Sequence, residues 1–301
     1  MNNIKHYSVM LNETINALDI KPNGTYVDLT LGRGGHSSAI LAKLDTGLLI
    51  SFDKDKQAIK ESNPRLVQIS KNFKLIHSDY SNIKNELEKL GIHSVDGIMA
   101  DIGVSSPQLD ESKRGFSYSK DARLDMRMDQ TQKMDAHFIV NNWSEVELSE
   151  IFRYYADVML PRRVAKGIVS NRPIDTTLQL VDVIRSSLPA AVVRKKNPAK
   201  AVFQAIRIAV NNELGALEKL VEDGPELLNK NGVLSIITFH SIEDRIVKRK
   251  FGSFIKDNTG KLPIIVKKEW DVKTKKPTRQ ELEENNRSRS AKLRTLIKRK
   301  D

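Results

Sequence analysis

The feature that most constrains the fold is a regular alternation of short apolar runs with helical patterns in the first hundred residues. Strands are expected at Tyr26–Leu31, Leu48–Phe52, Phe73–Ile76 and Val95–Ala100, and helices at His36–Lys43, from about Lys56, and at Ile83–Leu90. Alternation at this spacing predicts a parallel, doubly wound α/β sheet. Right-handed crossovers bring the carboxyl ends of such strands to one edge, where ligands bind. Asp53 and Asp101 directly follow the second and fourth strands, so we expect both carboxylates at that edge.

The alternation stops after Asp101, which indicates an insertion in the sheet domain. The following hundred residues are polar and helical in pattern, most clearly at Glu145–Tyr155 and Leu178–Leu188. The sheet pattern returns at Gly232–Phe239, behind a helix expected at Ala201–Leu220. We therefore expect a first part of the sheet domain, a helical insertion and a second part of the sheet domain, at residues 1–106, 107–200 and 201–301.

Two further strands are expected at Leu262–Lys267 and Lys292–Ile297. They could pair as a hairpin that closes the far side of the sheet. The charged segment between them, Thr274–Arg289, is expected to be a mobile loop.

A glycine-rich turn follows the first strand and contains Gly32, Gly34 and Gly35. Glycines there allow positive φ and let the backbone pass close to a ligand. Asp53 ends the second strand about twenty residues later, where a carboxylate can accept both hydroxyls of a ribose. The combination indicates an adenosine cofactor.

The turn favours a methyl donor over a dinucleotide. The dinucleotide fingerprint needs a third glycine, and this chain has Ser37 in that place. An acid ahead of the glycines, here Asp28, is typical of methyltransferases, and Tyr80 after the third strand could stack on adenine or belong to an ordinary turn. A P-loop is excluded because no Gly-Lys-Ser/Thr follows the turn.

The chain is basic, with a net charge of +12, and the placement of the charge suggests a polyanionic partner. Residues 245–301 hold 19 Lys and Arg against 7 Asp and Glu, whereas the remainder has 31 of each sign. Such a concentration of positive charge suits nucleic acid, although a solvated, solubilising tail has the same composition. The chain has no cysteine, no apolar signal core and no membrane-length apolar run, so we expect a cytoplasmic protein without a disulfide framework.

Three longer blocks are more specific than the turn. They read DIGVSSPQLD from Asp101, NPAKAVFQAIRIAVNNEL from Asn197 and ITFHSIEDRIVK from Ile237. With His6–Leu11, the glycine turn, Arg114–Tyr118, Leu124–Asp129 and the stretch NRSRSAKLRTL from Asn286, they cover nearly the whole chain in order. The sequence resembles the bacterial 16S rRNA cytosine-N4 methyltransferase family (RsmH, also called MraW).

The resemblance implies a Rossmann-like class I methyltransferase sheet interrupted by an inserted helical domain, for which we expect a part in RNA recognition. It implies S-adenosyl-L-methionine as cofactor and a cytidine in the decoding region of 16S rRNA as substrate. The size of the split domain favours rRNA within the small ribosomal subunit, and free rRNA stays open as the alternative. By position, the family's cofactor contacts fall on Gly34, Gly35, His36, Asp53, Tyr80, Asp101 and Gln108. It leaves open whether the chain acts as a homodimer.

The exocyclic N4 of cytosine is a poor nucleophile because its lone pair is delocalised, so the reaction needs a proton acceptor. Amino-methyltransferases of DNA use a Pro-Pro-aromatic motif after strand four, and this chain has neither Pro-Pro nor an aromatic there. Asp101 is our candidate, either on the cofactor, on N4 or on both. His240, which follows the fifth strand, is the second candidate, although a strand-end histidine is often structural. The scattered histidines predict no metal site.

Arginines interleaved with aromatic residues suit single-stranded RNA, since bases stack on rings. The candidates for RNA contact are Arg114, Arg127, Arg207, Arg245, Arg287 and Arg289. Arg245 could instead pair with its neighbour Asp244, and Phe116 could belong to the core of the insertion.

Two other functions are compatible with the pattern. An NAD-linked dehydrogenase uses a related sheet, but the basic tail and Ser37 argue against it. A non-catalytic RNA-binding or assembly factor would tolerate the loss of Asp53 and Asp101.

Overall fold

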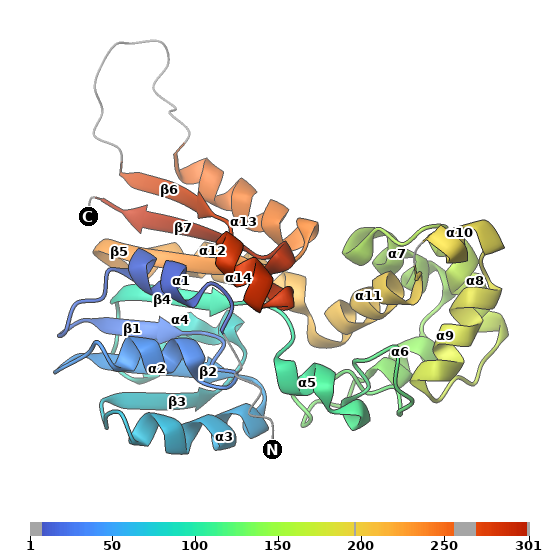
Figure 1. The fold of residues 1–301 in the computed structure, drawn as a ribbon, viewed down its shortest axis with the longest axis horizontal. Coiled ribbons are helices and arrows are strands. Elements are labelled where there is room, and N and C mark those ends of the chain that lie inside the picture. The colour runs from blue at the N-terminus through green and yellow to red at the C-terminus, as the bar shows by residue number, and fades with distance from the viewer. Residues whose placement is uncertain (1–7, 196, 256–268, 300–301) are drawn as a thin grey trace, which may run out of the picture. The chain divides into compact units, whose positions relative to one another are not determined.

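A seven-stranded sheet organises the larger of two compact units in the computed structural model, which describes residues 8–195, 197–255 and 269–299. This sheet unit comprises residues 1–103 and 215–301, and the helical unit comprises residues 104–214 (Figure 1). The strands are β1 (Thr25–Asp28), β2 (Leu48–Asp53), β3 (Phe73–His77), β4 (Val95–Asp101), β5 (Leu228–Thr238), β6 (Trp270–Lys275) and β7 (Lys292–Lys298). The helical unit is therefore inserted between β4 and β5.

The strand order is β3-β2-β1-β4-β5-β7-β6, with β1 to β5 parallel and β7 antiparallel to both neighbours. This order confirms the expected Rossmann-like class I methyltransferase sheet with a helical insertion. The chain runs outward from β1 to β3 and then returns to β4 on the other side of β1. That reversal makes the carboxyl ends of β1 and β4 the point at which such sheets bind ligands.

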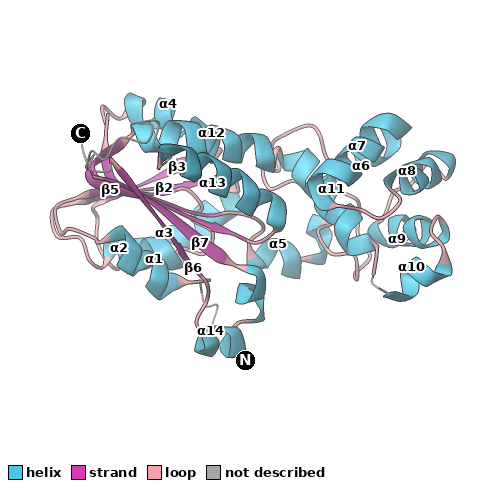
Figure 2. Ribbon diagram, turned by 90° about the horizontal axis from the view of Figure 1, so that it is seen from above, coloured by secondary structure: helices cyan, strands magenta, loops and turns pink. Residues whose placement is uncertain are grey.

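Helices cover both faces of the sheet, as Figure 2 shows. One face packs against α1 (Leu11–Leu18), α2 (Gly35–Leu41) and α3 (Lys56–Val67), around a cluster that includes Tyr26 and Met99. The other face packs against α4 (Ile83–Lys89), α12 (Glu213–Glu226) and α13 (Ser241–Phe254). Because β1, β2 and β4 are buried on both sides, they read as continuous apolar runs rather than alternating ones.

The helical unit has its own apolar core, which includes Phe116, Met126, Phe152 and Phe203. Its helices are α5 (Ser106–Asp110), α6 (Ala136–Asn142), α7 (Glu145–Ala156), α8 (Pro161–Ser170), α9 (Thr177–Ser186), α10 (Ala190–Lys195) and α11 (Ala199–Asn211), with a 3₁₀ turn η2 at Ser112–Arg114. Capping boxes at Ser105, Ser144 and Thr176 fix the starts of α5, α7 and α9.

The single helix predicted at Ala201–Leu220 is wrong. The chain forms α11 and α12, separated by Asn212 in the left-handed conformation at φ 49°. The compact units accordingly divide at Gly215, after α11, which contributes its apolar stripe to the helical core.

The prediction of a mobile loop at Thr274–Arg289 is wrong. β6 extends to Lys275, and the helix α14 (Arg279–Glu284) and the 3₁₀ turn η3 (Asn286–Ser290) follow. The predicted strand Leu262–Lys267 lies outside the described residues, and β7 pairs instead with β6 in an antiparallel hairpin.

Candidate active site

Three aspartates end adjacent parallel strands at one edge of the sheet. Asp28 is the last residue of β1, Asp53 of β2 and Asp101 of β4. Because β1 lies between the other two strands, these carboxyl groups flank the reversal in strand order. The sheet therefore gathers negative charge at the place where its ligand is expected.

The glycine turn between β1 and α2 adopts backbone conformations that favour glycine. Gly32 has φ 50° and Gly34 has φ 75°, both in the left-handed region. A Cβ on Gly34 would also lie 3.3 Å from the Cβ of Ser62, on α3. The Ser62 hydroxyl donates to the Gly32 carbonyl at 2.8 Å and ties the turn to that helix.

Asp28 stabilises this turn through hydrogen bonds to residues on either side of it. It is completely buried, and its carboxylate accepts from the Thr30 N–H at 3.0 Å and the Ser37 hydroxyl at 2.6 Å. Burial raises its pKa to about 6, and those hydrogen bonds oppose the rise. Both oxygens are engaged within the chain, so the structure gives Asp28 a part in holding the turn.

Asp53 connects the turn to β2. Its Oδ2 accepts from the Gly32 N–H and its Oδ1 from the Asp55 N–H, each at 2.8 Å. Burial raises its pKa to about 6, against the effect of these two hydrogen bonds. The carboxylate is half-buried and retains lone pairs that could accept hydroxyl groups.

Of the three strand-end aspartates, Asp101 has the fewest hydrogen bonds to its carboxyl group. Its backbone N–H donates to Thr30 Oγ1 at 2.7 Å, but its buried Oδ1 accepts no hydrogen bond from the described residues. Burial raises its pKa to about 8, and the charges of Asp28, Glu243 and Glu281 add to the effect. A carboxyl of this kind can exchange a proton near neutral pH.

His36 lies beside Asp101, with its Nδ1 4.0 Å from Oδ2. The ring is only 4% exposed, and burial lowers its pKa to about 4, against the effect of a hydrogen bond to the Val9 backbone. His36 is therefore neutral at pH 7, and the two side chains form no ion pair at that pH.

Two further predicted cofactor contacts belong to different units. Tyr80 starts the 3₁₀ turn η1 (Tyr80–Asn82) after β3, where it is half-buried against the core of the sheet unit. Gln108 lies on α5 in the helical unit and is 5% exposed. Its Oε1 accepts from the Ser105 N–H at 2.9 Å, which completes a capping box.

His240 serves as the N-cap of α13. Its Nδ1 accepts from the Glu243 N–H at 3.4 Å, and its Nε2 lies 2.8 Å from Glu243 Oε1. Glu243 is 2% exposed, and its Oε2 accepts from the N–H groups of Phe239 and His240. Nδ1 thus caps the helix, whereas Nε2, although close to Glu243, is buried and makes no hydrogen bond with the described residues.

Three of the predicted RNA-contacting arginines are engaged inside the helical unit. Arg114 is 4% exposed and donates to the carbonyls of Arg127 and Met128. Arg127 forms a bidentate pair with Asp125, at 2.7 and 2.9 Å. Arg207 forms the same kind of pair with Glu213, at 2.8 and 2.9 Å.

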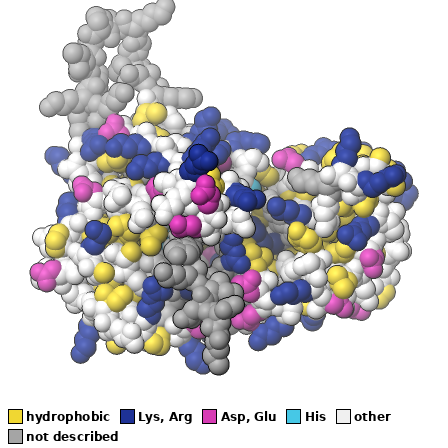
Figure 3. Space-filling model, in the orientation of Figure 1, with side chains coloured by type: hydrophobic (Ala, Val, Ile, Leu, Met, Phe, Trp, Pro, Cys, Tyr) yellow, Lys and Arg dark blue, Asp and Glu magenta, His cyan; other side chains and the backbone are white. Residues whose placement is uncertain are grey.

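The other three arginines are exposed on the sheet unit. Arg245 does not pair with Asp244, because that carboxylate binds Lys292 at 2.8 Å and Arg294 at 2.6 Å. Among the described residues, the side chains of Arg245 and Arg289 make no hydrogen bond or ion pair. Arg287 is exposed on the same 3₁₀ turn, η3, as Arg289. Lys and Arg side chains are numerous on the face of the molecule seen in Figure 3.

Sequence comparison decides the family. A model of the MraW methylase family matches residues 3–299. The chain belongs to the MraW methylase family. A relative from Mycoplasmopsis agalactiae, called ribosomal RNA small subunit methyltransferase H, is 56% identical over 98% of both chains. Proteins of the same name from Mycoplasma mobile and Mycoplasmopsis pulmonis are 52% and 55% identical, over 97% of this chain and 97% and 99% of their own lengths.

The sheet edge fits the methyl donor of such a methylase. S-adenosylmethionine carries a positive sulfonium, and the edge offers the carboxylates of Asp53 and Asp101. Asp101 Oδ1 is buried and accepts no hydrogen bond from the described chain, so a cationic or hydrogen-bonding ligand would satisfy it. Gly32 and Gly34, which adopt positive φ, carry no Cβ that would cover the backbone of the turn.

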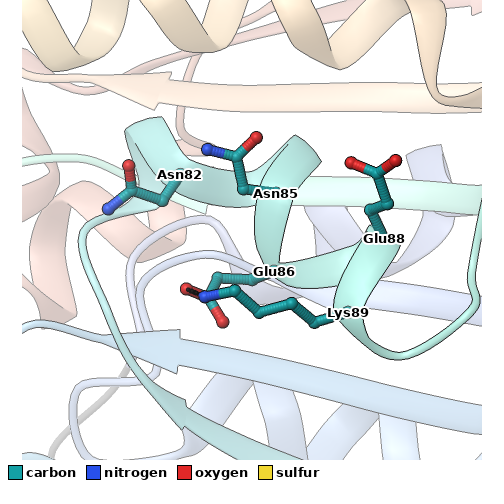
Figure 4. Close-up of a pocket in the computed structure, with 5 residues that line it drawn as sticks. All are labelled: Asn82, Asn85, Glu86, Glu88 and Lys89. Carbon is teal, nitrogen blue, oxygen red and sulfur yellow. Dashed lines mark hydrogen bonds and ion pairs between the residues drawn. The ribbon is translucent and has the colours of Figure 1, made fainter.

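A surface depression on α4 is a separate feature. Asn82, Asn85, Glu86, Glu88 and Lys89 line it, and an ion pair of 2.8 Å joins Lys89 to Glu86 (Figure 4). It includes none of the strand-end acids and no residue of the glycine turn, so it has no part in the site.

Sequence reasoning missed several residues that build the site. Ser37 was noted only as an absent glycine, yet it supports Asp28 and contacts the Ser51 hydroxyl at 2.8 Å. Glu243 is expected from its place after strand five to face this edge, but its capping role is not predicted because the capping-box pattern normally starts with Ser or Thr and here starts with His240. Glu281 reaches the edge from α14, and no local pattern could have indicated that.

Proposed function

We propose that this MraW methylase transfers a methyl group from S-adenosyl-L-methionine to N4 of a cytidine in the decoding region of 16S rRNA. The observation that carries the proposal is the family match over residues 3–299, together with strand-end acids at the predicted cofactor positions. The relatives are named small-subunit rRNA methyltransferases, which supports ribosomal RNA as substrate.

The cofactor, once bound, supplies an electrophilic methyl group on a good leaving group. The chain has to bind the cofactor and the target base, orient them for methyl transfer and exclude water. We assign the ribose hydroxyls to Asp53, the close backbone approach to Gly34 and Gly35, and adenine to Tyr80. His36 and Gln108 keep the cofactor roles that their family positions suggest.

Asp101 is our choice for the group that accepts a proton from N4. Methylation of an amino group leaves a proton to be removed, and a carboxylate whose pKa lies near the working pH does this efficiently. The pKa of about 8, raised by burial, places Asp101 in that range. His240 is the weaker candidate because its ring caps α13.

For RNA contact, the proposal rests on Arg245, Arg287 and Arg289. All three are exposed in the region that holds the basic excess. The contacts of Arg114, Arg127 and Arg207 support a structural role in the helical unit. If Arg245 and Arg289 bind phosphate, replacing either with Gln should weaken binding and reduce the slope of log affinity against log salt by about one. An unchanged slope in both variants would exclude them from the interface.

The primary test measures transfer of labelled methyl from S-adenosylmethionine to purified small subunits that lack the modification, followed by nucleoside analysis. Label in N4-methylcytidine is expected, with loss in Asp53→Ala and retention in Asp45→Ala, an exposed carboxyl before β2. Tight cofactor binding without label on subunits or on free rRNA would refute the substrate. Failure to bind the cofactor would refute the methyltransferase and favour a non-catalytic RNA-binding factor.

Substrate form, assembly and location can be tested separately. Comparing free rRNA with assembled subunits identifies the form that the chain recognises, and light scattering distinguishes a monomer from a homodimer. A ribosomal substrate supports the expected cytoplasmic location. In the described ranges, none of the helices is long and apolar enough to cross a membrane.

A further inference from the structure

A short segment before α1, Ser8–Met10, lies against the glycine turn; we refer to it as the strap. Val9 is 8% exposed and Met10 is fully buried, in a cluster with Ile237, Ala291 and Leu293. Met10 has φ 52° and ψ 36°, a left-handed conformation that residues with a Cβ adopt at a cost. Surrounding contacts must therefore hold the strap in this conformation.

The strap touches two residues at the predicted cofactor positions. A Cβ built on Gly35 would lie 1.8 Å from the Ser8 hydroxyl and 3.1 Å from the Ser8 Cβ, so the Ser8 side chain occupies the space beside the Gly35 backbone that a larger residue would need. The Val9 backbone also forms a hydrogen bond with the buried His36 ring. Movement of the strap would therefore free both residues of the turn.

Glu281 contacts the strap through the Met10 backbone. Its Oε1 accepts from the Met10 N–H at 2.7 Å, across 271 positions of sequence. The carboxyl is half-buried on α14, and the buried Ser288 hydroxyl donates to the Asn285 carbonyl at 2.7 Å within the same α14–η3 segment. The Glu281 carboxylate has no cationic partner among the described residues. Its contribution to the contact with Met10 is therefore the oxygen that accepts the hydrogen bond.

We propose that Glu281 is a positioning residue that, through Met10, holds the strap against Gly35 and His36 and so keeps the cofactor turn in its binding conformation. The inference rests on the proposed function. Without the Glu281 oxygen, the Met10 N–H is left in a buried site without an acceptor, which is unfavourable. The left-handed Met10 then relaxes, and the turn loses its cover.

The contact needs an acceptor at the right reach and does not need a charge. Glu281→Gln keeps an oxygen at the same distance from the backbone, whereas Glu281→Asp keeps the charge but withdraws it by one methylene. The two variants separate reach from charge, and Glu281→Ala removes both. Glu283, exposed on the same helix with its carboxylate 3.4 Å from Arg279, offers the matched control Glu283→Ala.

The test combines calorimetric affinity for S-adenosylmethionine with hydrogen exchange of the full chain. Glu281→Ala and Glu281→Asp should bind the cofactor about fivefold to thirtyfold more weakly and exchange the Met10 amide at least about tenfold faster. Glu281→Gln and Glu283→Ala should stay within about twofold of wild type in both measurements. The amides of β4 and β5 serve as an internal reference that distinguishes a loosened strap from an unfolded variant.

Wild-type affinity in Glu281→Asp, or a loss in Glu281→Gln equal to that in Glu281→Ala, would overturn the proposal. An unchanged Met10 exchange rate in Glu281→Asp would do the same. If the wild-type chain itself does not bind the cofactor, the proposed function fails instead. The exchange comparison would then still show whether Glu281 holds the strap.

Discussion

Replacing Asp101 with Asn should stabilise the cofactor-free chain, and by more at pH 8 than at pH 5. Asp101 has a buried oxygen that accepts no hydrogen bond from the described residues, and burial raises its pKa to about 8. Asparagine has nearly the same shape and carries no charge. The substitution therefore removes the cost of ionising this group in the folded state.

The magnitude follows from the difference between the folded and unfolded pKa. The pKa of the Asp101 carboxyl is raised from 3.8 to about 8 in the folded chain. One pKa unit corresponds to about 1.4 kcal/mol, so ionising Asp101 lowers the free energy of unfolding by at most about 6 kcal/mol. Because the folded pKa is the higher one, the folded chain binds this proton more tightly. Stability is then greatest below about pH 4 and is lost as the pH rises toward 8.

Most of that loss falls between pH 5 and pH 8. The Asp101 side chain is 23% exposed, and water reaching it reduces the effect, so we expect wild type to lose about 2–4 kcal/mol relative to Asp101→Asn over this range. The pKa values of Asp28 and Asp53 are raised in the same direction. Those two groups are present in both proteins, so most of their contribution cancels in the comparison.

The assay is urea unfolding without cofactor, at intervals of one pH unit from 5 to 8. A Trp143→Phe background leaves Trp270, on β6, as the only tryptophan, so fluorescence reports on the sheet unit alone. Asp45→Asn, at an exposed position, is the control and should give a curve parallel to wild type. Parallel curves for wild type and Asp101→Asn would refute the reasoning, because they would mean that Asp101 is charged in the fold without cost.

Three other substitutions test the packing of the molecule. Gly35→Ala should lower the free energy of unfolding by about 1–3 kcal/mol because its Cβ meets Ser8, with recovery in a Ser8→Gly background; no recovery would refute the contact. Gly252→Ala on α13, where no atom of the described residues outside the local helix backbone lies within 4 Å of the new Cβ, should instead stabilise by about 0.5–1 kcal/mol; a loss of stability in urea would contradict the open space. Asp244→Ala leaves the buried cation on β7 unpaired and should cost about 2–4 kcal/mol, whereas a cost below about 1 kcal/mol would mean that the pair is screened by water.

The parallel part of the sheet could be predicted because its strands are buried on both faces. Such strands are continuous apolar runs between turns, and the strand-end acids Asp53 and Asp101 follow from the pattern. The edge strand β6 could not be found in this way, since three of its six residues are exposed and two of those are lysines. The break between α11 and α12 was missed because one left-handed residue, Asn212, interrupts an apolar pattern that continues on both sides.

For the site, local sequence indicates residue types but does not reveal which side chains are already engaged. Arg114 follows the pattern of an RNA-binding arginine, yet its guanidinium donates to backbone carbonyls inside the helical unit. Arg245 could have paired with Asp244, and only the structure shows that β7 supplies that partner. The contact between Glu281 and Met10 spans nearly the whole chain, so no motif could have predicted it.

The division of the sheet unit into two chain segments has a consequence for synthesis. β4 emerges from the ribosome more than a hundred residues before its neighbour β5, so one edge of the nascent sheet waits unpaired for roughly ten seconds at ordinary rates of translation. The helical unit is contiguous and can fold during that interval. Since Met10 receives its acceptor only after α14 has been made, the first segment of the cofactor edge to be synthesised is among the last to be fixed. A chain truncated before α14 would contain Asp28, Asp53 and Asp101 but would lack the Glu281 oxygen that holds Met10 beside the glycine turn.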